Sequence, residues 1–239
     1  MIRAVLFDVD DTLVDTRGAF RYALAAVGEK YLTADVTPDE LTHTWRTDVG
    51  GHYRAHTRGE LSYREQRKRR ANEIHALYGG PSLEDDDAYD EWNEGFEAAF
   101  RAGWRAHDDA IGCLDDLAAA GIPFGALSNA AVAYQEAKLA ASGLDRVPML
   151  VGVDTLGFGK PDPRVFALAC ELIGEDPSHV AYVGDEYDID AVAATAAGMR
   201  GIWLDRSGDL RNPPSHGVGR PEPHVETIIT LASLAELIR

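Results

Sequence analysis

Residues 2–12 read IRAVLFDVDDT, a short apolar run that ends abruptly at Asp8 and continues into further acids and a threonine. Such a run is typical of a strand buried on both faces of a parallel sheet. Ligands of open parallel sheets bind at the carboxyl ends of the strands, which is where Asp8 and Asp10 would lie. Paired carboxylates there could act as nucleophile and general acid/base, although Asp and Thr also suit a plain turn or helix cap.

Beyond residue 108 the chain alternates between apolar runs and helical patterns. We expect strands at 122–129, 147–154, 179–186 and 200–205, helices at 111–121, 131–143, 162–174 and 188–198, and a short strand and a last helix within 223–239. This alternation predicts a doubly wound α/β domain with a parallel, Rossmann-like sheet. The segment 207–223 is rich in Gly and Pro, and we expect an exposed loop there.

Residues 17–107 have a different character. Apolar residues recur at helical spacing and predict no strand, but about four helices, at 19–32, 38–49, 62–78 and 87–104. Pro38, the Gly50-Gly51 pair and the segment 79–81 separate these helices. We therefore expect a helical domain at 17–107 inserted into a core of residues 1–16 and 108–239, with hinges at 15–18 and near 107–109.

The charge of the chain excludes several kinds of partner. It has 239 residues, and 40 Asp and Glu against 23 Lys and Arg leave a formal net charge of −17. This charge argues against binding to nucleic acid or to anionic membranes. No segment resembles a signal peptide or a membrane span, and Cys113 and Cys170 form neither a disulfide framework nor a metal motif. We expect a soluble cytoplasmic protein, whose oligomeric state the sequence does not indicate.

The basic residues are unevenly divided. Only four are lysines, at Lys30, Lys68, Lys138 and Lys160. An acidic chain with few lysines favours a halophilic origin, because self-repulsion is screened within about 3 Å at about 1 M salt. A GC-rich genome would also favour arginine and remains the alternative.

Polar residues follow the other predicted strands too. Ser128 and Asn129 follow the second strand and suit a phosphate, and Lys160 in GFGKPDP offers a point charge for one. Asp185 in GDEYDID (184–190) follows another strand, where a buried acid needs a cation such as Mg²⁺. Each signal has a simpler explanation when taken alone: helix capping, or a solvated lysine.

Taken together and in order, these segments resemble a known family. FDVDDTL (7–13), LSN (127–129), GKPDPRVF (159–166) and VGDEYDIDAVAATAAGM (183–199) are similar to the four motifs of haloacid dehalogenase superfamily hydrolases. The similarity runs over nearly the whole chain, and the helical insertion lies where the family carries a type 1 helical cap. The sequence departs from the pattern at Asp11, where many members carry Gly, and at Glu186 and Ile189, where small or polar residues are common.

The resemblance implies a role for each motif residue. Asp8 would be the nucleophile that forms an aspartyl-phosphate, and Asp10 the general acid and base. The side chains of Asp8 and Asp185 and the main-chain carbonyl of Asp10 would bind Mg²⁺. Ser128, Asn129 and Lys160 would bind the phosphoryl group. Thr12 and Asp190 would support the site.

The expected function is Mg²⁺-dependent hydrolysis of a small phosphomonoester, in the manner of phosphoglycolate phosphatases. Family dehalogenases lack an acid at the position of Asp10, so its presence favours a phosphatase. A 2-haloacid dehalogenase is the alternative, and a non-catalytic regulatory protein that retains the fold is another. Phosphoglycolate, sugar phosphates and nucleoside monophosphates all stay open as substrates. Four cap residues could contact the substrate, although a surface or cap-core role is favoured for them: Arg46, His52, Tyr53 and Arg54. The basic run at 64–70 is interpreted as a solvated helix face paired with acids.

Overall fold

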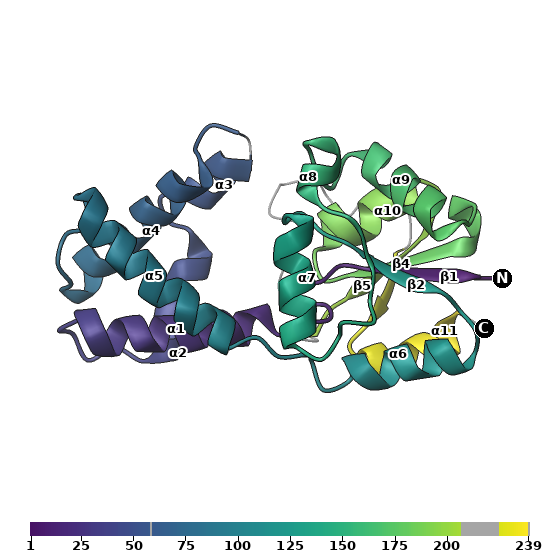
Figure 1. Cartoon of the computed structure of the whole chain (residues 1–239), viewed down its shortest axis with the longest axis horizontal. Helices are drawn as coiled ribbons and strands as arrows, with labels where there is room; N and C mark the ends of the chain where they lie inside the picture. The colour runs from purple at the N-terminus through teal and green to yellow at the C-terminus, as the bar shows by residue number, and fades with distance from the viewer. Residues whose placement is uncertain (58, 207–224, 239) are drawn as a thin grey trace. The chain divides into compact units, whose positions relative to one another are not determined.

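The computed structural model describes residues 1–57, 59–206 and 225–238. It divides into two compact units, one formed by Met1–Asp15 with Arg105–Arg239 and the other by Thr16–Trp104. Figure 1 shows both units, the first built around a sheet and the second entirely helical. The loop expected at 207–223 lies outside the described residues.

The first unit contains a six-stranded parallel sheet, which confirms the predicted fold class. Its strands are β1 (Ala4–Phe7), β2 (Phe124–Leu127), β3 (Met149–Val151), β4 (Val180–Gly184), β5 (Arg200–Leu204) and β6 (Glu226–Ile228), arranged in the order β3-β2-β1-β4-β5-β6. The chain runs outward from β1 to β3 and then returns to β4 on the other side of β1. Ligand crevices of such sheets open at this switch point, so the site belongs at the carboxyl ends of β1 and β4.

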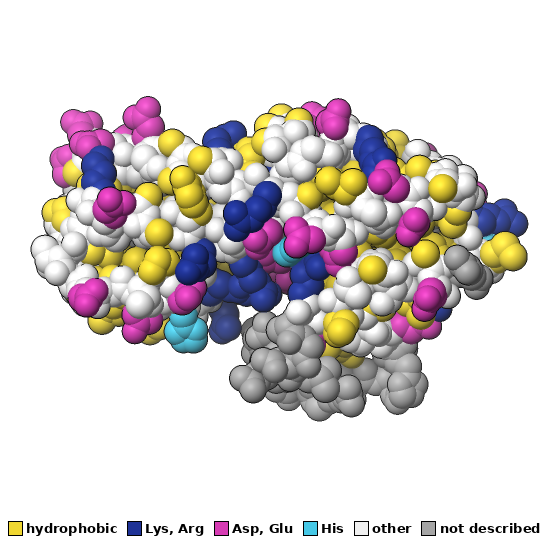
Figure 2. Space-filling view, turned by 90° about the horizontal axis from the view of Figure 1, so that it is seen from below, with side chains coloured by type: hydrophobic (Ala, Val, Ile, Leu, Met, Phe, Trp, Pro, Cys, Tyr) yellow, Lys and Arg dark blue, Asp and Glu magenta, His cyan; other side chains and the backbone are white. Residues whose placement is uncertain are grey.

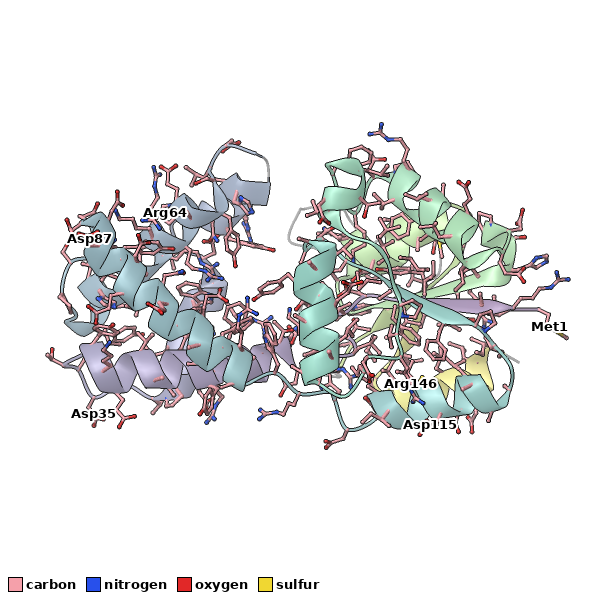
Figure 3. The ribbon with its side chains drawn as sticks, viewed as in Figure 1. Met1, Asp35, Arg64, Asp87, Asp115 and Arg146 are labelled. Atoms are coloured by element: carbon pink, nitrogen blue, oxygen red, sulfur yellow. The ribbon has the colours of Figure 1, made fainter. Side chains whose placement is uncertain are left out.

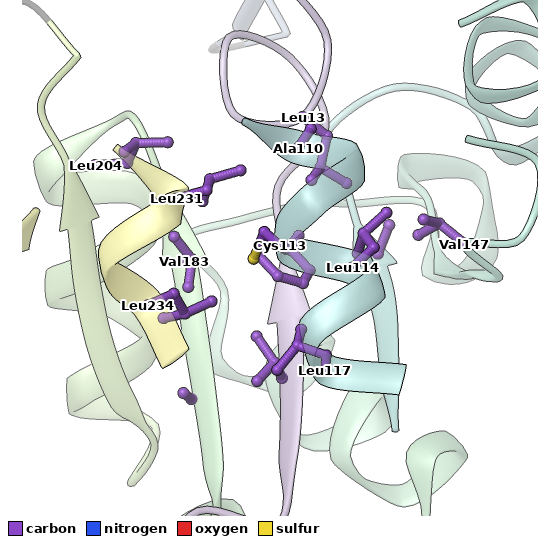
Figure 4. Packing of buried hydrophobic residues seen from close by; sticks show 14 of the residues in the cluster. Leu13, Ala110, Cys113, Leu114, Leu117, Val147, Val183, Leu204, Leu231 and Leu234 are labelled. Carbon is purple, nitrogen blue, oxygen red and sulfur yellow. The ribbon is translucent and has the colours of Figure 1, made fainter. Parts of the chain in front are cut away.

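Helices cover both faces of the sheet, and β1 shows why its sequence is apolar throughout. Val5 and Phe7 enter a core cluster on the face covered by α6 (Ala110–Ala119) and α11 (Leu234–Leu237), which Figure 4 shows from close by. Ala4 and Leu6 enter the opposite cluster, under α9 (Pro163–Ile173) and α10 (Ala193–Ala196). Since side chains alternate between faces, a strand buried on both sides has no polar position.

Several connecting elements differ from the expected helices. The helix expected at 188–198 is formed by π-helical turns, η2 (Tyr187–Val192), followed by the single turn of α10. The strand expected at 147–154 is only three residues long, and α8 (Val153–Leu156) includes its last two positions. The other short elements of this unit are α7 (Val132–Ala141), η1 (Pro177–His179) and η3 (Leu231–Ser233).

The helical unit contains one helix more than expected. Its helices are α1 (Thr16–Tyr31), α2 (Pro38–Thr47), α3 (His52–Thr57), α4 (Tyr63–Tyr78) and α5 (Asp86–Ala102). The additional helix is α3, which begins after the Gly50-Gly51 pair and whose first backbone N–H groups donate to the carboxylate of Asp48. Aromatic rings of α1, α2 and α5 pack together in this unit, stacked within α5 and tilted between helices: Phe20, Trp45, Trp92, Phe96 and Phe100.

The two segments that connect the units pair with each other. Asp15 N donates to the carbonyl of Arg105 at 3.0 Å, and His107 N donates to the carbonyl of Leu13 at 2.9 Å. Asp15 and Arg105 also form an ion pair at 3.2 Å. The segments expected to act as hinges are therefore joined by both backbone and side-chain contacts.

On the face that Figure 2 shows, acidic side chains lie at several separate places on each unit. Many are paired with arginine, as Asp115 on α6 is with Arg146 at 2.6 Å; both are labelled in Figure 3. Among the described residues, none of the helices has the length and apolar character needed to cross a bilayer.

Candidate active site

Asp8 directly follows β1 and is buried at the carboxyl ends of β1 and β4. Its N–H donates to the carbonyl of Val183 at 2.9 Å, and one of its carboxylate oxygens accepts from Lys160 Nζ at 2.7 Å. Burial raises the pKa of the Asp8 carboxyl to about 8, an effect that Lys160 reduces and the carboxylates of Asp190 and Asp10 increase. A carboxylate can act as a nucleophile only when ionised, so this position calls for additional positive charge.

Lys160 is bound on all sides by groups of the site. Its Nζ donates to Asp8, to Asp190 Oδ1 at 2.6 Å and to the Tyr182 hydroxyl at 2.9 Å, which uses all three ammonium protons. Burial by itself would lower the pKa of Lys160, but the two carboxylates outweigh it and hold the pKa well above its usual value. Lys160 therefore remains an ammonium ion beside Asp8.

The backbone of Lys160 is held by the side chain of Asn129. Asn129 Oδ1 accepts from Lys160 N at 2.6 Å, and Asn129 Nδ2 donates to the Lys160 carbonyl at 2.9 Å. A Cβ atom on Gly159 would lie 2.2 Å from Asn129 Oδ1, so glycine is required for this close approach. The side chain of Asn129 thus positions Lys160, and the expected contact of its backbone with phosphate stays a prediction.

Asp190 lies in η2 and is almost fully buried. In addition to the Lys160 contact, its Oδ2 accepts from the backbone N–H of Glu186 at 3.0 Å. The carboxylate packs against Gly184 so closely that a Cβ there would be 2.3 Å from Asp190 Cγ. Asp190 was expected to support the site, and the structure places it in direct contact with Lys160.

Tyr182 was not identified from the sequence as part of the site. It lies on β4, where its apolar ring suits the core, and its hydroxyl donates to the carbonyl of Leu127 at 3.2 Å. Only the tertiary structure reveals that this hydroxyl reaches Lys160, which lies in the segment between α8 and α9.

Ser128 directly follows β2 and is buried. Its Oγ accepts from Gln135 Nε2 at 2.8 Å and from Ala130 N at 3.3 Å. Because both contacts use the oxygen as an acceptor, the hydroxyl proton is left to donate to another group. This geometry suits the oxygen of a phosphoryl group.

Asp10 is the most open of these carboxylates, with 36% of its side chain exposed. Its Oδ1 accepts from Lys138 Nζ at 2.5 Å and its Oδ2 from Gln135 Nε2 at 2.6 Å. Sequence reasoning missed both donors, which lie within the helix expected at 131–143. The available signals were the scarcity of lysine and the spacing of three residues, which places both side chains on one face of the helix.

Three carboxylates of the site could hold a metal ion together. Asp8, Asp185 and Asp190 each place a carboxylate oxygen within 4.8 Å of the other two. Hard oxygen donors of this kind are the ligands that Mg²⁺ prefers. Asp185 is partly exposed, yet burial and the like charges of Asp11 and Asp8 raise its pKa well above the usual value. A divalent cation would relieve this crowding of negative charge, so the donor set fits the ion.

The turn after Asp10 is held through its backbone rather than through the side chain of Thr12. Thr12 is fully buried, and its hydroxyl makes no hydrogen bond with any of the described residues. The turn is instead fixed through its backbone, because Arg206 donates to the carbonyls of Asp11 at 3.1 Å and Thr12 at 2.7 Å. Arg206 was missed in the sequence, although its place just after β5 was a signal.

Asp11 departs from the family pattern for a conformational reason. Its φ is +57°, in the left-handed region that glycine occupies freely and that Asp tolerates better than most residues. This explains how Asp can stand where many family members have Gly.

The cap residues singled out in the sequence make contacts within the helical unit. His52 Nε2 lies 3.0 Å from Glu73 Oε1, and the ring of Tyr53 packs against the guanidinium of Arg70. Arg54 contributes its backbone N–H to the carboxylate that caps α3, and Arg46 lies in α2. Any contact of these residues with a substrate stays a prediction.

The basic run at 64–70 is paired with acids, as expected. Lys68 binds Asp86 at 2.9 Å, and Arg69 binds Glu65 at 2.5 Å. The interpretation as a solvated face is wrong for Arg67, which is buried and bound to Glu97 and Tyr63. The reason is that its guanidinium stacks on aromatic rings of the helical unit.

Comparison with known proteins identifies some relatives that are phosphatases and others that are haloacid dehalogenases. Glyceraldehyde 3-phosphate phosphatase of Methanopyrus kandleri is 28% identical over 246 residues, covering 97% of this chain and 99% of that protein. (S)-2-haloacid dehalogenase 1 of Pseudomonas sp. strain CBS-3 is 28% identical over 245 residues, covering 99% and 95%. Phosphoserine phosphatase of Thermus thermophilus is 35% identical over 113 residues, which are 46% of this chain and 45% of that protein.

Solved structures share the fold over the full length. The HAD-hydrolase YfnB from Bacillus subtilis, solved bound to magnesium, superposes with a TM-score of 0.76 at 24% identity and covers 99% of this chain and 98% of its own. The model of the family described as haloacid dehalogenase-like hydrolase matches residues 2–198. Together with the carboxylates and the serine at the strand ends, this match shows that the chain belongs to the haloacid dehalogenase-like hydrolases.

Proposed function

We propose that this hydrolase is a Mg²⁺-dependent phosphatase that cleaves a small phosphomonoester through an aspartyl-phosphate on Asp8. The observation that carries the proposal is Asp10, a partly exposed carboxylate held by Lys138 and Gln135 close to Asp8. A halide leaves as a stable anion, whereas an alkoxide leaving group must be protonated. An acid at this position therefore serves ester hydrolysis and has no task in dehalogenation.

The proposed reaction has two steps, and Asp10 gives up a proton in the first and regains one in the second. In the first, a carboxylate oxygen of Asp8 attacks phosphorus, the bond from phosphorus to the ester oxygen breaks, and Asp10 gives its proton to that oxygen. In the second, the ionised Asp10 takes a proton from a water molecule whose oxygen attacks the same phosphorus. The bond to Asp8 breaks, phosphate is released, and both carboxyl groups return to their starting states.

Other residues of the site would stabilise the charge of the phosphoryl group. The Ser128 hydroxyl has its proton free to donate, and Lys160 is an ammonium ion beside Asp8. The side chains of Asp8 and Asp185 and the main-chain carbonyl of Asp10 would hold Mg²⁺, which supplies charge neutralisation for the nucleophile and the phosphoryl oxygens. In this proposal the helical unit acts as a cap that excludes water and selects the substrate.

A second candidate is 2-haloacid dehalogenation. It is favoured by the dehalogenase relative, which matches the chain as completely as the phosphatase relative and at the same identity. A third is a binding or regulatory protein that retains the fold without turnover.

The decisive experiment is a phosphate-release screen with Mg²⁺ and molar KCl over phosphoglycolate, sugar phosphates and nucleoside monophosphates. We expect turnover of at least one ester, complete loss in Asp8→Asn, and a loss of about 100-fold or more in Asp10→Asn. Asp145→Asn removes the same charge at an exposed position and is expected to leave turnover unchanged.

The alternatives have their own readouts. Halide release from 2-chloropropionate without phosphate release would show a dehalogenase. Folded protein that releases neither product would indicate a binding protein, and unchanged turnover in Asp8→Asn would exclude the covalent route.

A further inference from the structure

We propose that Lys138 and Gln135 are positioning residues that hold Asp10 in place for proton transfer to the ester oxygen. The inference rests on the proposed function, because Asp10 has a proton to transfer only if the leaving group is an alkoxide that must be protonated. It adds to that function a pair of side chains from α7, outside the four family motifs quoted above.

The placement of α7 explains how the two side chains reach the site. The backbone N–H of Val132, at the first turn of the helix, donates to the carboxylate of Asp154 at 2.9 Å. Asp154 belongs to α8, so a neighbouring segment caps α7 and fixes its start. Residues three apart share a helix face, and Gln135 and Lys138 therefore point to the same side.

The two donors bind different oxygens of the same carboxylate. Lys138 Nζ is 2.5 Å from Asp10 Oδ1, and Gln135 Nε2 is 2.6 Å from Asp10 Oδ2. With both oxygens held, the plane of the carboxylate is fixed as well as its location. Restricting a reacting group in this way removes orientational freedom that would otherwise be lost on the way to the transition state.

Burial separates positioning from substrate binding. Only 3% of the Lys138 side chain is exposed, and its Nζ lies 5.2 Å from the centre of the Tyr134 ring. Gln135 is completely buried. Neither side chain is accessible to a substrate in this arrangement, whereas Asp10 is, so both act through Asp10.

Gln135 also connects the two halves of the site. The second N–H of its amide donates to Ser128 Oγ at 2.8 Å, so one amide group holds both the proposed acid and the proposed phosphoryl-binding hydroxyl. The amide is oriented by Asp10 Oδ2 and Ser128 Oγ, which both accept from Gln135 Nε2. The distance between Asp10 and Ser128 is thereby set by a rigid, buried side chain.

The test compares two esters of similar shape whose leaving groups differ in their need for a proton. The 4-nitrophenolate of 4-nitrophenyl phosphate leaves without one, whereas the alkoxide of 4-nitrobenzyl phosphate requires it. For Lys138→Met we expect kcat/KM to fall about 100-fold on the benzyl ester and less than about 5-fold on the phenyl ester. This ratio reports the step that releases the alcohol, and not the later hydrolysis step in which Asp10 acts as base for both esters. Lys30→Met removes an exposed lysine of the helical unit and is expected to change neither.

Equal losses of kcat/KM on the two esters would overturn the inference, since a structural or substrate-binding role predicts that result. If Lys138→Met does not fold, Gln135→Met takes its place, and a loss no greater on the benzyl than on the phenyl ester has the same meaning. Failure of the proposed function looks different: wild-type protein then hydrolyses neither ester, and the inference fails with it.

Discussion

Replacing Gly184 by alanine would test whether the buried carboxylate of Asp190 keeps Lys160 in place. A Cβ at Gly184 would lie 2.3 Å from Asp190 Cγ, and ordinary contact begins at 3.4 Å, so the carboxylate must retreat by about 1.1 Å. Asp190 is only 1% exposed and has no route into solvent. The displacement must therefore stretch the contacts that hold it.

The geometry gives the size of the effect. Asp190 Oδ1 is 2.6 Å from Lys160 Nζ, and its Oδ2 is 3.0 Å from Glu186 N. A retreat of about 1 Å breaks at least one of these bonds, and a hydrogen bond to a charged group contributes about 1.5–3 kcal/mol. We expect Gly184→Ala to lower the free energy of unfolding by about 2–4 kcal/mol, and kcat by about 10–100-fold through the displaced Lys160.

Denaturant unfolding in molar KCl, followed by fluorescence, measures the first quantity, and the ester assay measures the second. Gly112→Ala is the matched control, since it lies in α6 with open space around the added Cβ. It is expected to stabilise the protein by about 0.5–1 kcal/mol. If Gly184→Ala unfolds at the wild-type denaturant concentration and retains full kcat, the reasoning about Asp190 and Lys160 is refuted.

Three further predictions concern metal, acid and thiols. Adding Mg²⁺ to EDTA-treated protein should restore turnover and raise the melting temperature, and an equal rise in Asp185→Asn would contradict the assigned donor set. Asp109→Asn should lower the free energy of unfolding at pH 7 by about 1–2 kcal/mol after allowance for partial exposure. Although burial alone would raise it, hydrogen bonds from Arg206 and Thr230 lower the pKa of Asp109 from 3.8 to about 2. This stabilisation is complete above about pH 4 and disappears as the pH falls through 2, so denaturation curves of the two proteins should converge over that range. Burial raises the pKa of Cys113 to about 12 and that of Cys170 to about 11. At pH 8, Ellman's reagent should therefore label native protein at least about 100-fold more slowly than unfolded protein. Comparable labelling rates would count against this burial.

The architecture of the core could be predicted because its signals are local. The run at 2–7 is apolar since both faces of β1 are covered, and the helices and strands after residue 108 alternate as a parallel sheet requires. Boundaries were less certain where tertiary contacts decide them. The helix expected at 188–198 became η2 and a single turn, with the Asp190 carboxylate of η2 buried against Lys160 and Gly184.

Part of the site could also be predicted, because strand ends are marked by an abrupt change from apolar to polar residues. Asp8, Ser128 and Asp185 each follow a strand directly, and the parallel sheet brings them to one edge. Tyr182 carries no such mark, and the place of Arg206 just after β5 does not reveal which groups it contacts. Tyr182 is indistinguishable in sequence from a core residue of β4, and Arg206 reaches a turn nearly two hundred positions earlier in the chain.

The sequence by itself determined the class of fold, the family and the residues at the strand ends, because burial and strand termination leave local patterns in the chain. Only the tertiary structure decided which side chains hold those residues. Lys138 contacts Asp10 across 128 positions, and Lys160 contacts Asp8 across 152. Such contacts depend on how α7 and the loop after β3 dock on the sheet, and docking follows from packing and charge neutralisation among distant groups, which no local pattern records.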